Sequence, residues 1–345
     1  MSALKNKHLI TISFLRMCIS GLFAILILNL LIAFYYMLPL HINNPQETTD
    51  YIWQPNSFWI KMTEGIAWGK MDELGFNNQQ VIKNPEVLIL GSSHMEATNV
   101  CQDENTASLL QNEFENRGLA FKVYNHGISG HHFLKCCKYL SNNMQSDSLK
   151  YVIIETSNVG FSQTEIEDLL SGKIDFTTSY TKGILAFLQK LPFFRLLYFQ
   201  IDHGLLDLFL PKKPIHINST AQDNSDLVPA SYEKLFSFVK ENSNDKPIVI
   251  FFHPTGNPDV NGNLVFNTDE FASSLFSETA KEYGIDFIDL TAQTEKLWHT
   301  EHKTTHGFCT GTAFSGHLNK NGHKIAAQAI ADMILSHQEN IRDEN

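Results

Sequence analysis

The stretch that most constrains the fold is an apolar run that ends in one glycine and two serines. Val87–Leu90 has the apolar, partly β-branched character of a buried strand. Gly91 follows and permits a sharp turn before residues that can begin a helix. In a parallel α/β sheet this turn lies at the carboxyl end of the strand, where ligands bind. Ser93 is then expected at a helix N-terminus, where free N–H groups favour the negative charge of an oxyanion.

The turn alone leaves two interpretations open. It is not the Gly-x-Ser-x-Gly elbow of the α/β-hydrolases, because Met95 stands where the second glycine belongs. It suits a nucleophilic serine, and it equally suits an ordinary strand-to-helix turn with a serine N-cap.

Strand and helix patterns alternate through the rest of the chain. Strands are predicted at residues 87–90, 121–124, 151–155, 248–252 and 287–290. Helices are predicted at residues 107–117, 133–142, 232–241, 269–283 and 320–336. Strands separated by helices predict an α/β fold with a doubly wound parallel sheet. An insertion at about 160–229, rich in Phe and Leu near its centre, is expected to be either a helical subdomain on the sheet or a lid or membrane-facing surface.

An apolar run near the N-terminus predicts a membrane anchor. Residues 17–40 are long enough to cross a bilayer as a helix. Lys5, Lys7 and Arg16 precede the run, and no Lys or Arg follows it until Lys61, so residues 1–16 are expected in the cytoplasm. A cleaved signal peptide is the alternative, but no small-residue cleavage site follows. Residues 41–84 then read as a stalk and lead-in, and residues 85–340 as an extracytoplasmic domain.

Composition limits the partners of this domain. The formal net charge of −11, with no long basic run, argues against a nucleic-acid partner. The 345 residues are enough for one large domain with a full core.

Polar groups follow several of the predicted strands, and a histidine precedes the last helix. Gly130 follows the second strand, Asn158 follows the third, and His317 comes just before Lys320. These ends converge on one edge of a doubly wound sheet. Acyl transfer needs a nucleophile, a base and oxyanion donors. Ser93 and His317 can be the first two, while Gly130 and Asn158 can supply donors.

These four blocks together resemble the SGNH (GDSL-like) hydrolase family. Gly91-Ser92-Ser93 is similar to its first block, residues 125–130 to its glycine block, Asn158 to the Asn of its third block, and residues 317–322 to its histidine block. The resemblance spans about residues 85–337. It implies a flavodoxin-like fold and hydrolysis or transfer of an O-acyl ester, with O-acetyl expected. With the anchor, it implies an acylated glycan or other cell-surface polymer as substrate, a membrane acyltransferase as partner, and no cofactor.

The chain departs from that family at the acid. Phe314 stands where the acid is usual, three residues before His317. A Ser93–His317 dyad is therefore expected, with Asp289, Glu301 or a backbone carbonyl as substitutes for the acid. The alternative is a non-catalytic accessory protein that binds a glycan or an acyl donor beside a membrane acyltransferase.

Histidines and cysteines offer two further sites. His299, His302 and His306 have a spacing that could place them on one helical face, but the residues around Thr304 make a continuous helix doubtful, so no metal is expected. Cys101 and Cys309 either form a disulfide or remain free thiols.

Overall fold

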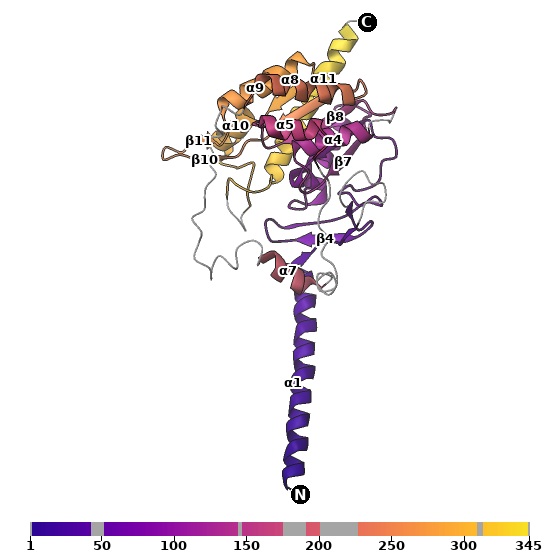
Figure 1. Cartoon of the computed structure of the whole chain (residues 1–345), viewed down its shortest axis with the longest axis vertical. Helices are drawn as coiled ribbons and strands as arrows, with labels where there is room; N and C mark the ends of the chain where they lie inside the picture. The colour runs from indigo at the N-terminus through magenta and orange to yellow at the C-terminus, as the bar shows by residue number, and fades with distance from the viewer. Residues whose placement is uncertain are drawn as a thin grey trace. The chain divides into compact units, whose positions relative to one another are not determined.

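The computed structural model describes residues 2–42, 52–143, 147–174, 191–200, 227–308 and 313–343 (Figure 1). The chain forms two compact units. One unit comprises residues 1–38 and 179–214, and the other comprises residues 39–178 and 215–345.

The larger unit is built on a five-stranded parallel sheet with strand order β12-β9-β8-β6-β7. Its strands are β6 (Val87–Gly91), β7 (Val123–Gly127), β8 (Tyr151–Thr156), β9 (Ile248–Phe252) and β12 (Asp286–Asp289). The order places β6, the strand before Ser93, between β7 and β8. This confirms the predicted α/β class with a doubly wound parallel sheet.

Helices cover both faces of the sheet. They are α2 (Ser93–Glu96), α3 (Thr106–Asn116), α4 (Phe133–Asn143), α5 (Gln163–Leu170), α8 (Pro229–Asn242), α9 (Glu270–Glu282), α10 (Thr291–Glu301) and α11 (Lys320–Asp343). Successive strand residues point to opposite faces. Leu88 and Leu90 therefore pack with α4, α5, α8 and α9, whereas Val87 and Ile89 pack with α3 and α11.

One predicted strand is shifted by polar residues that prove to be buried. The second strand runs over Val123–Gly127 rather than 121–124. Asn125 looks like a turn residue, yet it pairs with Ile89 of β6 and is 2% exposed. Its amide donates to Met95 O at 2.7 Å and accepts from Gly127 N–H at 2.9 Å. These hydrogen bonds offset the cost of burying the polar side chain. The sequence patterns also did not predict the helices α5 and α10.

The segment expected to be a stalk and lead-in contains short antiparallel strands. These are β2 (His41–Ile42) with β3 (Ile52–Trp53), and the hairpin of β4 (Phe58–Lys61) with β5 (Ala67–Lys70). Trp59 of β4 is completely buried. Asn78 then donates to Asn125 O at 2.9 Å and accepts from Asn125 N–H at 2.9 Å, which ties the segment to β7. A small hairpin, β10 (Gly256–Pro258) with β11 (Leu264–Phe266), follows β9.

The smaller unit holds α1 (Ser2–Ala33) and α7 (Pro192–Gln200) (Figure 1). Thr11–Ala33 of α1 is 23 residues long with a mean hydropathy of 2.3, which suffices to cross a membrane. Such a helix near the N-terminus is either a signal sequence or a single membrane anchor. Asn29 of α1 accepts a hydrogen bond from Phe193 N–H at 3.1 Å, so the two helices of this unit are joined. Much of the Phe- and Leu-rich centre of the insertion lies outside the described residues.

Candidate active site

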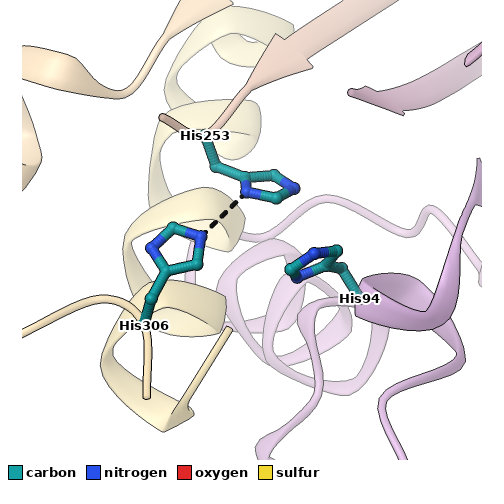
Figure 2. Close-up of side chains that lie close together, drawn as sticks. All are labelled: His94, His253 and His306. Atoms are coloured by element: carbon teal, nitrogen blue, oxygen red, sulfur yellow. Dashed lines mark hydrogen bonds between the residues drawn. The ribbon is translucent and has the colours of Figure 1, made fainter. Parts of the chain in front are cut away.

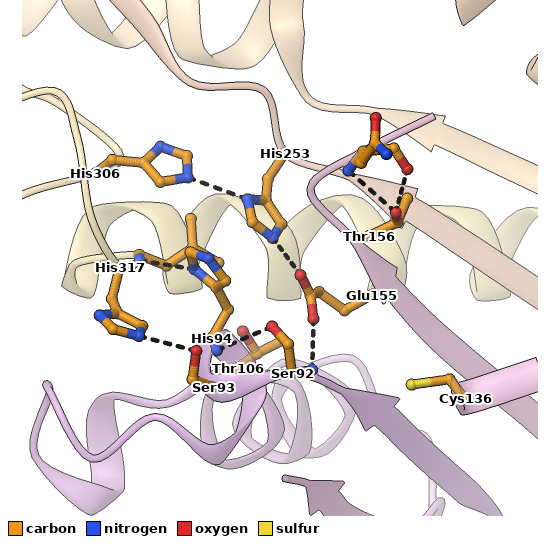
Figure 3. A network of polar contacts seen from close by, with 12 residues as sticks. Ser92, Ser93, His94, Thr106, Cys136, Glu155, Thr156, His253, His306 and His317 are labelled. Atoms are coloured by element: carbon orange, nitrogen blue, oxygen red, sulfur yellow. Dashed lines mark hydrogen bonds and ion pairs between the residues drawn. The ribbon is translucent and has the colours of Figure 1, made fainter. Parts of the chain in front are cut away.

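The turn that carries Ser93 has the predicted geometry. Ser92 is the N-cap of α2, and its Oγ accepts from His94 N–H at 3.3 Å. Ser93 is therefore the first residue of the helix, as the strand–turn–helix pattern indicates. Its side chain is part of the network of polar contacts in Figure 3.

Two glycines allow the turn to pack tightly. A Cβ atom at Gly91 would lie 2.4 Å from the Met95 side chain and 2.8 Å from a carboxylate oxygen of Glu155. A Cβ atom at Gly127 would lie 2.3 Å from the backbone of both Met95 and Glu96. These separations are too short for any side chain, so both positions require glycine for close approach rather than for an unusual φ.

His317 meets Ser93 across 224 residues of sequence. The Nε2 atom of His317 lies 2.9 Å from Ser93 Oγ (Figure 3). The residues that follow Ser93 and His317 are also bonded to each other, because Leu318 N–H donates to His94 Nδ1 at 3.1 Å. The structure thus joins the two predicted catalytic side chains.

The carboxylate that orients His317 comes from Glu64, in the turn between β4 and β5. Its oxygens lie 2.7 and 2.8 Å from His317 Nδ1, and Oε1 also accepts from His317 N–H at 3.1 Å. The Nζ atom of Lys61 lies 3.9 Å from Glu64 Oε2. Glu64, His317 and Ser93 therefore form a continuous chain with the geometry of an acid–base–nucleophile triad.

Electrostatics fix the protons along this chain. Burial alone would raise the pKa of Glu64, but the hydrogen bond and charge of His317, together with Lys61, hold it below its usual value. Glu64 is then an anion at neutral pH and accepts the Nδ1 proton of His317. The lone pair on Nε2 faces the Ser93 hydroxyl, which is the arrangement that general-base catalysis requires.

The expectation of a dyad without a carboxylate is therefore wrong, and so are the proposed substitutes. Asp289 accepts from Thr291 N–H at 2.8 Å, and Glu301 pairs with Lys303 at 2.7 Å. Phe314 packs against Trp298 with ring centroids 5.0 Å apart. The family pattern places the acid just before the histidine, and neither that position nor the suggested substitutes indicate Glu64. A Glu beside Gly65 in a Trp-rich hairpin carries no signal that separates it from a surface turn.

The predicted oxyanion donors are the backbone N–H groups of Ser93 and Gly130 and the side chain of Asn158. Within the described part of the chain, neither N–H group makes a hydrogen bond. Asn158 is exposed and uses part of its amide within its own turn, donating to Gly160 O at 2.8 Å. An Asn amide has two donors, so one N–H remains. No hydrogen bond joins Gly130 or Asn158 to Ser93 or His317 among the described residues, so their role remains a prediction.

Three other histidines gather beside the triad. One nitrogen of each of His94, His253 and His306 lies within 4.8 Å of the others (Figure 2). Three neutral imidazoles can bind zinc, and burial keeps the pKa of His306 at about 2 and that of His94 well below its usual value. However, His253 Nδ1 and His306 Nε2 already bond to each other at 3.0 Å. His94 Nδ1 also accepts Leu318 N–H, which leaves the proton on Nε2.

The histidine set that the sequence suggested is separated. His299 lies on α10, and His302 ends that helix in a left-handed conformation with φ +52°. His306 belongs instead to the buried group with His94 and His253. The state of the Cys101–Cys309 pair is not described, because Cys309 lies outside the described residues.

Comparisons with known proteins find similarity in structure only. No protein-family model matches the sequence, and no curated protein sequence is significantly similar to it. An acetyl xylan esterase matches with 13% identity and a TM-score of 0.41, over 72% of this chain and 99% of its own. A lipase/acylhydrolase from Enterococcus faecalis matches with 12% identity and a TM-score of 0.40, over 73% and 96%.

A two-domain esterase active on acetylated mannans matches with 13% identity and a TM-score of 0.40, over 72% of this chain. This chain spans only 48% of that esterase. Similarity at this level leaves the chemistry and the substrate to be inferred from the side chains themselves.

Proposed function

We propose that this protein is an SGNH-type serine esterase or O-acyltransferase. The observation that supports the proposal is the hydrogen-bonded chain from Glu64 through His317 to Ser93. The backbone N–H groups of Ser93 and of Gly130, which follows the neighbouring strand β7, have no hydrogen bond among the described residues. Nucleophile, base, orienting acid and oxyanion donors are the parts that acyl transfer needs.

In the first half of the reaction, Ser93 Oγ attacks the ester carbonyl and His317 Nε2 takes the hydroxyl proton. The carbonyl oxygen becomes an oxyanion that accepts from the N–H groups of Ser93 and Gly130 and from the Asn158 amide. Glu64 stabilises the imidazolium that forms, without taking its proton. When the tetrahedral intermediate collapses, the bond to the alcohol breaks and His317 gives the proton to the leaving oxygen. An acyl-Ser93 remains.

In the second half, His317 removes a proton from an incoming hydroxyl, which attacks the acyl-Ser93 carbonyl. The bond to Ser93 Oγ breaks and His317 returns the proton to it. Water as the nucleophile gives a carboxylic acid, whereas a sugar hydroxyl gives a new ester. The same groups therefore support hydrolysis and transfer.

For the substrate we propose an acylated glycan or other cell-surface polymer, with O-acetyl as the acyl group. The apolar helix Thr11–Ala33 supports this location. As an uncleaved anchor with its N-terminus in the cytoplasm, it would hold the domain on the outer face of the membrane, beside a membrane acyltransferase. The rival role, a non-catalytic binding protein, rested on the missing acid, and Glu64 removes that reason.

A serine-directed fluorophosphonate probe on the full-length protein in membranes tests the proposal. Wild type should be labelled covalently. Ser93→Ala should not be labelled, and its turnover of an aryl acetate should fall by at least about 10³-fold, because it lacks the nucleophile that the base activates.

Ser92→Ala is the matched control, since it removes the neighbouring hydroxyl, which caps α2 and contacts Glu155, but keeps the Ser92 N–H that bonds to Glu155. It should keep its labelling and most of its turnover. Loss of labelling in Ser92→Ala with retention in Ser93→Ala would show that the nucleophile is Ser92 instead, and an unlabelled wild type would contradict the proposed chemistry.

A further inference from the structure

A second set of hydrogen bonds connects the nucleophile turn to the histidine loop. On the loop side, Gly307 N–H donates to His317 O at 3.1 Å and Asn319 N–H donates to Thr305 O at 3.0 Å. His306 thereby forms an isolated antiparallel bridge with Leu318. The backbone of His306 is thus fixed to the loop that carries the catalytic base.

The side chain of His306 leads from that loop to the turn that carries Ser93. His306 Nε2 lies 3.0 Å from His253 Nδ1 (Figure 2), and His253 Nε2 lies 2.7 Å from Glu155 Oε1. Glu155 Oε2 then accepts from Ser92 N–H at 2.7 Å (Figure 3). The chain ends on the residue before the nucleophile.

Every proton in this series of hydrogen bonds can be assigned without a bound metal ion. Although burial favours the neutral acid, the bonds from His253 and Ser92 lower the pKa of Glu155, so both of its oxygens accept. His253 then donates from Nε2 and accepts at Nδ1 from His306. The hydroxyl of Thr305, 3.1 Å away, donates to His306 Nδ1. Every polar atom is satisfied, as burial at 2% exposure for Glu155, His253 and His306 requires.

We propose that Glu155, His253 and His306 are positioning residues that set the separation of Ser93 and His317 and aim the Ser93 N–H at the oxyanion. This inference rests on the proposed function. The catalytic hydrogen bond and the buried chain close one ring, which passes through Ser92, Ser93, His317, Gly307, His306, His253 and Glu155. Breaking the chain lets the turn and the loop shift relative to one another. A displacement near 1 Å is enough to lower a rate by about 10².

The hydrogen-bond directions also predict which substitution is tolerated. Glu155→Gln can still accept Ser92 N–H, but its amide N–H faces His253 Nε2. His253 and His306 can both adopt the other tautomer, so that His306 donates from Nδ1 to the Thr305 hydroxyl. Glu155→Ala has no such rescue.

The test compares these variants in the full chain. Glu155→Ala should lower kcat and the rate of Ser93 phosphonylation by about 10² with little change in KM, and Glu155→Gln should stay within about tenfold of wild type. Adding His306→Leu to Glu155→Ala should cause no further loss, because both break the same chain. His323→Gln, a buried histidine outside the ring that bonds to Thr106, is the control and should keep wild-type kcat.

The nitrogen chemical shifts of the histidines, measured on nitrogen-labelled protein, report the tautomers in this hydrogen-bond series without an activity assay. Each of His253 and His306 should show one neutral tautomer, and Glu155→Gln should invert both. Unchanged kcat in Glu155→Ala, equal losses in the Ala and Gln variants, or tautomers that do not invert would overturn the proposal. So would bound zinc in stoichiometric amount whose removal abolishes activity, because the cluster would then be a metal site. If the tautomers invert but wild-type Ser93 is not labelled, the buried hydrogen-bond series is supported and only the esterase function is contradicted.

Discussion

At the scale of single residues, the proposed chemistry depends on the charge of one carboxylate. Glu64 accepts from both the side chain and the backbone N–H of His317, so it fixes the position of the ring as well as its tautomer. In a serine protease, replacing the acid of the triad by its amide costs about 10⁴ in kcat, because the imidazole is held in the wrong tautomer. The same reasoning applies here, since a Gln amide could donate to Nδ1.

Glu64→Gln should therefore lower kcat by about 10³ or more while leaving the fold intact, and Glu64→Asp should recover part of the loss. Steady-state kinetics with an aryl acetate, together with a thermal unfolding curve for each variant, measure both effects. Asp289→Asn and Glu301→Gln serve as controls and should keep wild-type rates, because each carboxylate bonds elsewhere. If Asp289 or Glu301 supplied the acid, its variant would lose activity and Glu64→Gln would keep it.

At the scale of elements, the β4–β5 hairpin delivers Glu64 to the sheet edge. The hairpin can approach closely because Gly65 has no side chain. A Cβ atom there would lie 2.4 Å from Asn99 O and 2.7 Å from the Phe308 ring. Gln102 holds the other end of the hairpin, donating to Lys70 O at 2.6 Å.

Gly65→Ala should push the hairpin away from the Asn99 backbone and lengthen the contact between Glu64 and His317. We expect kcat to fall by about tenfold to 10², with KM and the unfolding temperature changed much less. Gly118→Asn is the control, because position 118 has open space and Asn tolerates its left-handed φ of +75°. Wild-type kcat in Gly65→Ala would mean that the hairpin can yield without moving the acid.

The elements differ in how well their sequences predict them. Apolar strands such as Val87–Leu90 and Ile248–Phe252 are found with little error, because burial on both faces leaves a continuous apolar run. The contact between Ser93 and His317 is predicted from short blocks beside such strands. Glu64 is not, since its partner lies 253 residues away and a two-stranded hairpin has no pattern that reports that contact. The cluster of His94, His253 and His306 is not predicted either, because its members come from three segments far apart in the sequence.

At the scale of the whole molecule, buried neutral histidines make the larger unit sensitive to acid. Burial lowers the pKa of His126 to about 4, of His131 and His323 to about 3, and of His306 to about 2. The same side chains take up protons near pH 6.5 in the unfolded chain. The unfolded state therefore binds more protons below that pH, so the stability present above about pH 6.5 is lost as the pH falls toward the folded pKa values.

The unfolding temperature should be nearly constant above about pH 7 and should fall steeply between about pH 6.5 and 5. Thermal unfolding followed by circular dichroism across this range measures the effect. His126→Phe removes one of the protons taken up and can still stack on Phe76, so its dependence on pH should be shallower. A flat profile down to pH 5 would show that these histidines are protonated in the folded state.

The position of Glu64 and Ser93 ahead of His317 in the sequence has a consequence during synthesis. The acid and the nucleophile leave the ribosome early, but the base follows Glu64 by 253 residues. Until that segment has been made, Ser93 has no group to take its proton and is an ordinary alcohol. If Ser93 is the nucleophile that we propose, a growing chain is unreactive toward esters, and it becomes reactive only when the loop with His317 folds back onto β6.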